Sequence, residues 1–337
     1  MPIVTTEHFK NGNLPLSKNG IPQVSEDDYC RLKGYMLETD DIVFSRVGSV
    51  DINAHVEHVQ QGWLFSGRVL RVRPIKSVNS LCLHYVLSTE SVKRDIRNRA
   101  VGQTMPSINT PILSNTEIYM SQSEAEQKKI ANLLSLLDER ITTQSKIIED
   151  LKKLKSAISH ILFSSKCAIR LSDIANVIMG QSPSSNAYND QGIGMPLVQG
   201  NLDISNGNTT PRLYTAEFNQ TAEEGNIILT VRAPVGEVAK ATKKVCLGRG
   251  VCAIIPHEEN MSDFIYQYLT FYKFMWRKYE QGSTFTSING SDVRNIPCPK
   301  VRNVSILTLL DRKINIEERV IKLYKSQKQY MLCQMFI

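Results

Sequence analysis

The residues in this chain that could do chemistry are mainly cations placed beside turns. Arg46 follows an apolar run at residues 41–45, Arg232 follows a similar run at 226–231, and a glycine closes the turn after each. Guanidinium groups donate paired hydrogen bonds to phosphate oxygens and to the major-groove edge of guanine. We therefore expect contacts with a nucleic acid from these two arginines and from four further cations, Arg68, Lys243, Lys244 and Arg249.

A second basic group ends the helical pattern at residues 80–99. Its cations are Lys93, Arg94, Arg97 and Arg99. They could face the phosphates of a nucleic acid. Alternatively, they could complement the dipole at the C-terminus of a helix, and the sequence leaves both interpretations open.

A polar loop follows at residues 102–109 and contains Thr104 and Asn109. The same loop recurs at residues 282–289, where Thr284 and Asn289 hold the equivalent positions. These four residues are also candidates for DNA contact. Domains that read different sequences should differ at their base contacts, however, so a loop that repeats favours a tight turn with a helix cap.

The sequence contains none of the common motifs for catalysis or cofactor binding. It lacks a G-x-x-x-x-G-K-[ST] phosphate loop, a complete G-x-G-x-x-G turn, a Cys/His metal cluster and a G-x-S-x-G nucleophile elbow. It also lacks the Asn/Asp-Pro-Pro-aromatic tetrapeptide of amino-methyltransferases. We therefore predict no catalytic residue, no cofactor-binding residue and no metal ligand.

The composition is that of a globular protein with a basic balance. The 337 residues carry a formal net charge of +7, and the pI is near 8.9. This charge favours a polyanionic partner. The seven cysteines show no metal-ligand or redox spacing, so reduced thiols are expected. Because we find no signal-peptide pattern and no apolar run of membrane-spanning length, we predict a cytoplasmic protein.

The longest uninterrupted helical pattern covers residues 123–163, which contain neither glycine nor proline. At about 1.5 Å per residue it would be roughly 60 Å long, so it must project from a domain or join two. Its apolar residues follow the spacing of a coiled-coil seam: Ile130, Leu134, Leu137, Ile141, Ile148, Leu151, Ile158 and Leu162. Four more residues widen the apolar stripe and predict a further packing surface, namely Leu133, Ile147, Leu154 and Ile161.

Residues 304–337 repeat this helical pattern. A shift of 173 positions aligns the two stretches at many identical residues, among them Asp138 with Asp311 and Lys155 with Lys328. The seam residues of the second stretch are Leu307, Leu310, Ile314, Ile321, Met331 and Met335. We expect the two helices to bury their seams against each other. The alternative is two independent surface helices, but shared composition alone does not give a shared register.

The segments before the two helices also correspond to each other. The matched segments are residues 1–4 with 195–198, 41–50 with 226–236, and 63–74 with 245–256. A period near 180 residues indicates a duplicated module, since solenoid repeats are about 20–50 residues long. We predict an α+β fold in which two α/β domains are separated by two long antiparallel helices that form a coiled coil with pseudo-twofold symmetry. The expected segments are 1–121, 122–166, 167–302 and 303–337.

This order of domain, helix, domain, helix resembles the specificity (S) subunits of type I restriction-modification enzymes over nearly the whole chain. Residues 126–138 resemble the start of the central helix of that family. Residues 41–50 and 231–236 resemble the strand and turn of its target-recognition domains. Residues 171–175 with 180–183 resemble the opening of such a domain.

The resemblance implies that each of the two target-recognition domains reads one half of a split double-stranded DNA site. The helix pair would set the spacing and dock two methylation (M) subunits, and restriction (R) subunits would complete the enzyme. S-adenosylmethionine, ATP and Mg are then expected on the partner subunits, and this chain would be non-catalytic. The alternatives are a coiled-coil scaffold that does not bind DNA, a self-contained DNA-modifying enzyme, and a truncated or inactive S subunit.

One departure from the family pattern concerns the first target-recognition domain. The second domain has about 25 residues, 170–194, before its repeat of residues 1–4, and the first domain shows no counterpart of them. Within this stretch, residues 171–177 show a helical pattern. We therefore expect a gap in the core of the first domain and weaker reading of its half-site.

Overall fold

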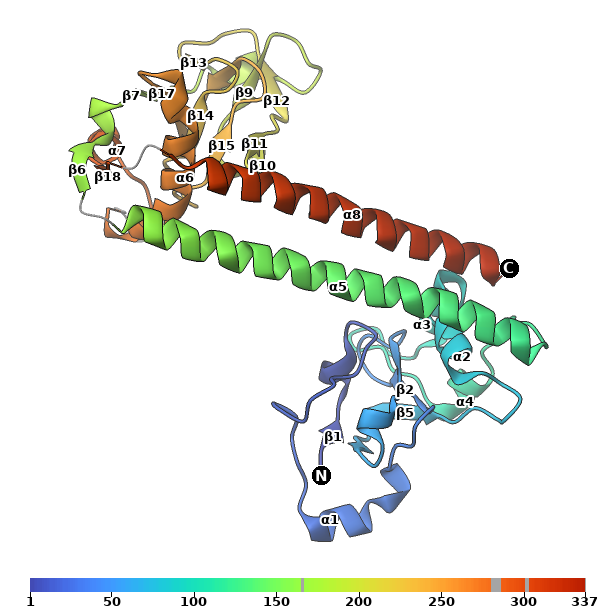
Figure 1. Cartoon of the computed structure of the whole chain (residues 1–337). Helices are drawn as coiled ribbons and strands as arrows, with labels where there is room; N and C mark the ends of the chain where they lie inside the picture. Colours follow the sequence, from blue (N-terminus) through green and yellow to red (C-terminus); the bar gives the residue numbers. More distant parts are fainter. Residues whose placement is uncertain (165–166, 280–285, 301–302, 337) are drawn as a thin grey trace. The chain divides into compact units, whose positions relative to one another are not determined.

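The computed structural model describes residues 1–164, 167–279, 286–300 and 303–336, and it divides into two compact units. Unit 1 is Met1–Lys146 with Arg319–Ile337, and unit 2 is Ile147–Glu318. Each unit therefore combines one globular part with a portion of each long helix (Figure 1). The four-segment division of the sequence stays a prediction.

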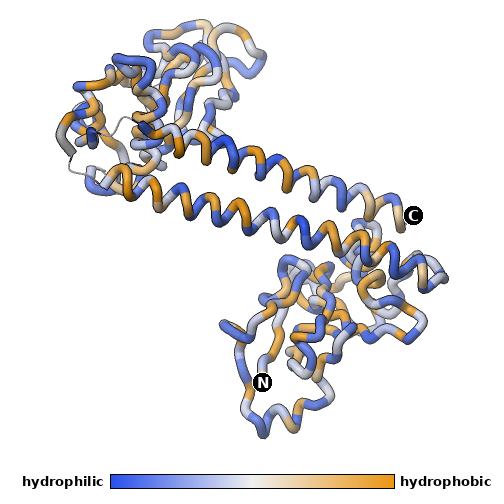
Figure 2. The backbone as a smooth tube through the Cα atoms, viewed as in Figure 1, coloured by the Kyte–Doolittle hydropathy of each residue, from blue (hydrophilic) through white to orange (hydrophobic). Residues whose placement is uncertain are grey.

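The two long helices are the largest elements of the fold. α5 (Glu124–Phe163) and α8 (Ser305–Met335) confirm both predicted helices. Neither contains glycine or proline, so the helical hydrogen-bond ladder has no built-in break. Figure 2 shows hydrophobic and hydrophilic residues alternating along both helices, as expected for helices with one buried side.

Within each unit, α5 and α8 run antiparallel. Contacts fix this direction because the residue number in α8 falls as the number in α5 rises. They are Asp138–Lys328 and Arg140–Tyr324 in unit 1, and Lys152–Glu318 and Lys155–Asp311 in unit 2. The predicted antiparallel pairing is thus confirmed in both units.

Unit 1 is organised around a three-stranded antiparallel sheet of order β3-β2-β5, and β1 pairs in parallel with β4. Ile42 and Phe44 of β2 pack with the helices on one face of the sheet, and Val43 packs on the other. Its elements are β1 (Ile3–Val4), α1 (Glu26–Arg31), β2 (Ile42–Ser45), β3 (Asn53–His55), β4 (Leu64–Phe65), β5 (Val69–Val72), α2 (Ser80–Leu87), α3 (Glu90–Arg99) and α4 (Thr110–Ser114).

Unit 2 contains a six-stranded sheet of order β10-β11-β15-β14-β17-β7, a five-stranded sheet of order β13-β16-β9-β12-β8, and the pair β18-β6. Its elements are β6 (Cys167–Arg170), β7 (Ala175–Met179), β8 (Tyr188–Asn189), β9 (Met195–Val198), β10 (Ile204–Ser205), β11 (Asn208–Thr209), β12 (Leu213–Thr215), β13 (Thr221–Ala222), β14 (Ile227–Thr230), β15 (Val238–Lys240), β16 (Val245–Leu247), β17 (Val251–Pro256), α6 (Ser262–Tyr272), α7 (Gly290–Arg294) and β18 (Pro297–Pro299).

The two units share one plan. The trio β3-β2-β5 of unit 1 corresponds to β15-β14-β17 of unit 2, and the register agrees: Ser45 lies opposite Val69, as Thr230 lies opposite Val251. The parallel pair β1 and β4 corresponds to β9 and β16. After each trio comes a helix, α2 or α6, that packs on the sheet. The predicted duplication is confirmed.

Two local predictions were wrong. The helical pattern at residues 80–99 forms two helices, because Thr89 is extended and its hydroxyl donates to the Val86 carbonyl at 2.8 Å. Residues 171–177 do not form a helix. They give a short 3-10 turn and then β7, whose Val177 and Ile178 side chains pack on opposite faces of the sheet.

In the part of the chain that the structure describes, no helix combines the length and the apolar character needed to pass through a lipid bilayer. The long helices carry charged residues throughout, which agrees with their place beside the globular parts.

Candidate nucleic-acid interface

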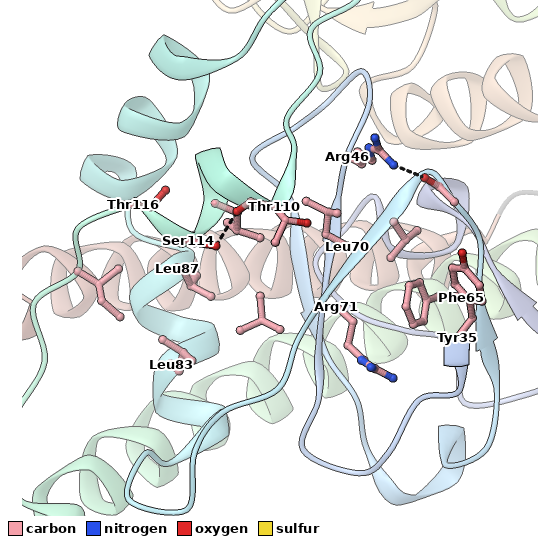
Figure 3. A pocket seen from close by; sticks show the side chains of 15 residues that line it. Tyr35, Arg46, Phe65, Leu70, Arg71, Leu83, Leu87, Thr110, Ser114 and Thr116 are labelled. Atoms are coloured by element: carbon pink, nitrogen blue, oxygen red, sulfur yellow. Dashed lines mark hydrogen bonds between the residues drawn. The ribbon is translucent and has the colours of Figure 1, made fainter. Parts of the chain in front are cut away.

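Two of the predicted arginines meet at one end of the unit 1 sheet. Arg46 is exposed directly after β2, and its main-chain N–H donates to the Arg68 carbonyl at 3.0 Å. The Arg46 guanidinium donates to the Gly67 carbonyl at 3.3 Å (Figure 3). The Ile108 N–H donates to the Arg46 carbonyl at 2.9 Å, which brings the polar loop at 102–109 to the same end.

Unit 2 repeats this arrangement with a shift of one residue. The Val231 N–H donates to the Gly250 carbonyl at 2.9 Å, and the Val231 carbonyl accepts from the Ile288 N–H at 3.0 Å. These are the bonds that Arg46 makes in unit 1, so Val231 corresponds to Arg46. Arg232, which is also exposed, stands one residue later.

The second arginine is displaced in the opposite direction. Gly250 makes the bond that Arg68 makes in unit 1, so Arg249 stands one residue before the counterpart of Arg68. The turns that carry Arg46 and Arg232 therefore correspond to each other, but the two arginines stand one position apart within them. Neighbouring side chains of an extended segment point to opposite faces, so the two units present their arginines in different directions.

Lys243 and Lys244 lie away from the unit 2 arginines. They follow the end of β15 where Lys240 pairs with Ile227, whereas Arg232 follows the opposite end of β14. Lys244 forms an ion pair with Glu223 at 2.5 Å, and the Lys243 ammonium lies 5.4 Å from the ring centre of Tyr214. The structure therefore does not bring these lysines into one site with the arginines.

The cations of α3 also separate. Arg97 pairs with Asp51 at 2.5 Å and with Glu90. Arg99 pairs with Asp95 at 2.9 Å. Arg94 is exposed, and the half-buried Lys93 lines a polar cavity of about 460 Å³ beside the Asp138–Lys328 pair. Arg97 and Arg99 are exposed as well, but both are engaged in ion pairs with acidic side chains of unit 1.

The repeated polar loops cap helices, as the repetition of the loop in both halves of the sequence had indicated. The Asn109 side chain accepts from the Ile112 N–H at 2.9 Å at the start of α4. The Asn289 side chain accepts from the Ser291 and Asp292 N–H groups at the start of α7. Thr104 is exposed, and Thr284 lies outside the described residues. Their proposed roles at DNA stay predictions.

The helix-pair seam is buried or half-buried at every predicted position. Leu134 and Leu307 are completely buried. The half-buried positions are Ile130, Ile141, Leu151, Ile158, Leu162, Leu310, Ile321, Met331 and Met335, and the other buried ones are Leu137, Ile148 and Ile314. The four residues expected to widen the stripe, Leu133, Ile147, Leu154 and Ile161, remain exposed.

The repeat produces matching ion pairs between the helices. In unit 1 the Lys328 ammonium lies 2.6 Å from the Asp138 carboxylate, and in unit 2 the Lys155 ammonium lies 2.6 Å from the Asp311 carboxylate. The four residues are the identical pairs that the 173-residue shift aligns. We did not predict these two ion pairs. They follow from the antiparallel direction, because the aspartate of each helix then lies opposite the lysine of the other helix.

The same carboxylates anchor the globular parts. The Tyr85 hydroxyl of α2 donates to Asp138 at 2.9 Å, and the Gln267 amide of α6 donates to Asp311 at 2.6 Å. Burial and then the nearby Asp138 charge raise the pKa of Tyr85. Tyr85 and Gln267 were not predicted from the sequence, because their residue types differ. They nevertheless hold corresponding positions in α2 and α6.

Among the residues that the structure describes, no group of His, Cys, Asp and Glu side chains could hold a metal ion. Burial raises the pKa of the Cys82 thiol to about 11 and that of Cys252 to about 12. These thiols are therefore poor nucleophiles at neutral pH.

The family model for the type I restriction modification DNA specificity domain matches the chain twice, over residues 1–153 and 167–323. A protein of Methanocaldococcus jannaschii, named as the candidate specificity subunit of type I restriction enzyme MjaX, is 30% identical over 334 residues. That match covers 88% of this chain and 76% of the relative. The MjaVIII specificity subunit of the same organism is 30% identical over 95 residues, which are 28% of this chain and 22% of that protein.

Solved structures show the same fold. The type I restriction-modification system S subunit from M. genitalium superposes with a TM-score of 0.64 at 20% identity, covering 90% of this chain and 84% of that one. A chain from a structural study of type I restriction-modification complex assembly gives a TM-score of 0.60 at 22% identity, with 89% and 82% covered. Since the family model matches both halves of the duplicated module, this chain belongs to the type I restriction-modification DNA specificity family.

Proposed function

We propose that this chain directs a type I restriction-modification enzyme to a split double-stranded DNA site, with each unit reading one half. The observation that carries the proposal is the arginine-bearing end of each sheet. Both units hold exposed arginines on the same main-chain scaffold, but at neighbouring positions, Arg46 and Arg68 against Arg232 and Arg249. Two readers of different half-sites require this combination of a common scaffold with different side-chain placement.

In this proposal the helix pair spaces the two units and docks the methylation subunits. α5 is continuous over 40 residues, and the globular part of each unit is anchored to the pair by a hydrogen bond to an aspartate, from Tyr85 to Asp138 and from Gln267 to Asp311. Each unit also exposes apolar side chains on these helices, which suit a protein partner. They include Leu133, Leu136, Leu323 and Tyr330 in unit 1, and Ile147, Leu154, Ile161, Ile306, Leu309 and Ile316 in unit 2.

The chemistry is assigned to the partners. Two methylation subunits would bring S-adenosylmethionine, and restriction subunits would bring ATP and Mg. This chain would contribute recognition and positioning without a catalytic group. The lack of the common catalytic and cofactor-binding motifs in its sequence and the raised pKa values of its buried thiols support this division.

Footprinting tests the proposal on the chain assembled with the methylation subunits of its own system. We expect two protected DNA patches separated by a constant gap. Arg46→Ala should weaken one patch and Arg232→Ala the other, each by about 1–3 kcal/mol if the arginine contacts a base. A single continuous patch, or equal weakening of both patches by either variant, would refute the split reading.

Two rival functions give different results in the same assays. A coiled-coil scaffold would assemble with partners yet show no salt-dependent DNA affinity. A self-contained modifying enzyme would methylate or cut DNA without the other subunits. Purified chain incubated with DNA and each cofactor separates these outcomes.

A further inference from the structure

Unit 1 contains a polar cavity of about 460 Å³ between its globular part and its portions of α5 and α8. Lysines dominate the charge of its described wall, namely Lys10, Lys93, Lys325 and Lys328. Asp138 is the single acid among the described residues of this wall. A cavity whose wall carries one sign of charge concentrates ions of the opposite sign, so this cavity favours an anion.

Two of these lysines have no acidic partner in the part of the chain that the structure describes. Lys328 takes part in the interhelix ion pair, and Lys10 pairs with Glu7 at 2.6 Å. Neither Lys93, which is half-buried, nor Lys325, which is exposed on α8, forms an ion pair with a described residue. Two positive charges of the wall are therefore not balanced.

The inner wall of the cavity is polar and uncharged. The Nδ1 atom of the buried His84 lies 2.6 Å from the side-chain oxygen of Asn53. Burial lowers the pKa of His84, and the charges of His55, Lys328 and Lys93 lower it further. The imidazole is therefore neutral at pH 7, and the positive potential of the lysines extends to this inner wall.

Unit 2 contains a corresponding cavity of about 530 Å³. The 173-residue shift aligns Asp138 in the wall of the first cavity with Asp311 in the wall of the second. Each wall also includes an Asn-Gly-Asn turn, at residues 11–13 in unit 1 and 206–208 in unit 2. The two turns correspond because each bridges in parallel to the equivalent strand, β3 or β15.

The charges of the second cavity differ from those of the first. Its described wall carries the basic residues Lys240 and Arg312 and the acidic residues Asp263, Asp311 and Glu318. Lys240 pairs with Asp263 at 2.7 Å. Two cations thus face three carboxylates, and the second cavity has no excess of positive charge. The two cavities share a position in the fold but should not bind the same ligand.

One aligned pair of residues accounts for part of this difference. Lys152, the counterpart of Lys325, forms an ion pair with Glu318 at 2.6 Å. The counterpart of Glu318 in unit 1 is Ser145, whose hydroxyl donates to the Ile141 carbonyl at 2.8 Å. Unit 1 therefore keeps the lysine of this ion pair without its acid.

We propose that the cavity of unit 1 binds a small molecule that carries a phosphate or diphosphate group. Ammonium groups at several points of one wall suit an anion with more than one negative charge. A phosphate monoester carries about −1.5 to −2 at neutral pH, whereas a carboxylate or a phosphodiester carries a single charge. The cavity volume also lies within the range of small-molecule sites, roughly 300–1,000 Å³.

The probe is inorganic pyrophosphate, titrated by calorimetry into the full chain in a chloride buffer without DNA. We expect one pyrophosphate bound per chain, because the cavity of unit 2 has no excess of positive charge. Lys325→Ala should weaken binding about tenfold through the loss of one charge-assisted contact. Lys322→Ala is the matched control, since Lys322 is also exposed on α8 but does not line the cavity, and it should change the affinity less than about twofold.

Ser145→Glu tests the charge argument without removing a lysine. It gives Lys325 the acidic partner that Glu318 provides in unit 2, so it should also weaken pyrophosphate binding about tenfold. Ser145 is exposed, and circular dichroism would confirm that the variant folds. The reverse exchange in unit 2, Glu318→Ser, should leave the affinity unchanged.

Three results would overturn the proposal: no saturable binding of pyrophosphate, equal weakening by Lys325→Ala and Lys322→Ala, or binding of the dicarboxylate succinate as tight as that of pyrophosphate. The proposal also fails if pyrophosphate does not bind while Lys93→Ala and Lys325→Ala lower the affinity for duplex DNA, because the lysines then contact the DNA backbone. Pyrophosphate binding is measured without DNA, so its result is independent of the proposed DNA recognition.

Discussion

The two units are built on the same sheet, but the outer edge of that sheet is covered by a strand in unit 2 and not in the described part of unit 1. Their central strands pair in the same register, yet Ile254 of β17 is sealed by β7, whereas Val72 of β5 borders an open groove. The helices α2 and α6 differ in sequence as well, since His84 stands where unit 2 has Tyr266. A duplicated scaffold thus keeps its hydrogen-bond pattern while its packing and side-chain chemistry change independently.

The largest expected effect on the free energy of unfolding comes from truncating a buried side chain of β17, compared with the corresponding side chain of β5. Ile254→Ala should cost about 3–4 kcal/mol of the free energy of unfolding of unit 2, because the side chain is completely buried. Val72→Ala should cost unit 1 about 1 kcal/mol or less, because the groove already exposes it. Denaturant unfolding measures both values. Trp63→Phe leaves Trp276 as the reporter of unit 2, and Trp276→Phe leaves Trp63 for unit 1.

Val69→Ala and Val251→Ala are the control for this comparison. Both valines are buried and occupy corresponding positions, so their costs should agree. If Val72→Ala lowered the free energy of unfolding as much as Ile254→Ala, the open edge of β5 would not reduce the contribution of Val72 to stability.

Acid should destabilise unit 1 more than unit 2. Burial, and then the nearby His55, lower the pKa of His84 from 6.5 to about 3. Between these values the unfolded chain binds a proton that the folded unit excludes. The free energy of unfolding therefore falls as pH falls, by up to about 1.4 kcal/mol per pH unit. Burial raises the pKa of Tyr266, so unit 2 has no such contribution from that position.

His84→Tyr tests this assignment because it places the unit 2 residue in unit 1. The variant should lose the extra slope between pH 6 and pH 4 when unit 1 is followed through Trp63. An unchanged slope would show that carboxylates, and not His84, govern the acid response.

Moving the arginine of unit 1 should sharpen the comparison of the two readers. The double variant Arg46→Val/Val47→Arg gives unit 1 the arrangement of Val231 and Arg232. Affinity for the natural half-site of unit 1 should fall about tenfold, while the melting temperature should hardly change, because the shared bonds are made by the main chain. Competition footprinting measures the preference. Unaltered half-site preference would mean that Arg46 contacts only phosphates.

The smallest expected effects are those of the two interhelix ion pairs. Double-mutant cycles on Asp138/Lys328 and Asp311/Lys155 should each give a coupling of about 0.5–1 kcal/mol, because the side chains are partly exposed. Salt should reduce both couplings equally. Clearly unequal values would argue against equivalent anchoring of the two units.

The sequence was sufficient where a periodic pattern repeats over many residues. The seam at Leu134 and Leu307 could be predicted because spacing alone determines the buried side of a helix. It was insufficient at β7, because the apolar residues at 171, 174 and 177 have a helical spacing although a strand begins at Ala175. Only pairing with β17 decides between the two.

The candidate site was predicted less well than the fold for a related reason. The sequence matched the two arginine-bearing turns only as segments, and the hydrogen-bond ladder shows that Arg46 and Arg232 stand one residue apart in register. Residue identity is a weak guide to register where the side chains of the two copies differ. The ladder, which is insensitive to side chains, is visible only in the structure.

The turn after β2 and β14 is held by bonds such as that from the Ile288 N–H to the Val231 carbonyl, and any amino acid other than proline can supply these groups. An arginine can therefore occupy any of several neighbouring positions while the main chain and its hydrogen bonds stay the same. Under the proposed function, one or two codon changes would move the arginine contact to a neighbouring position without refolding of the loop that presents it.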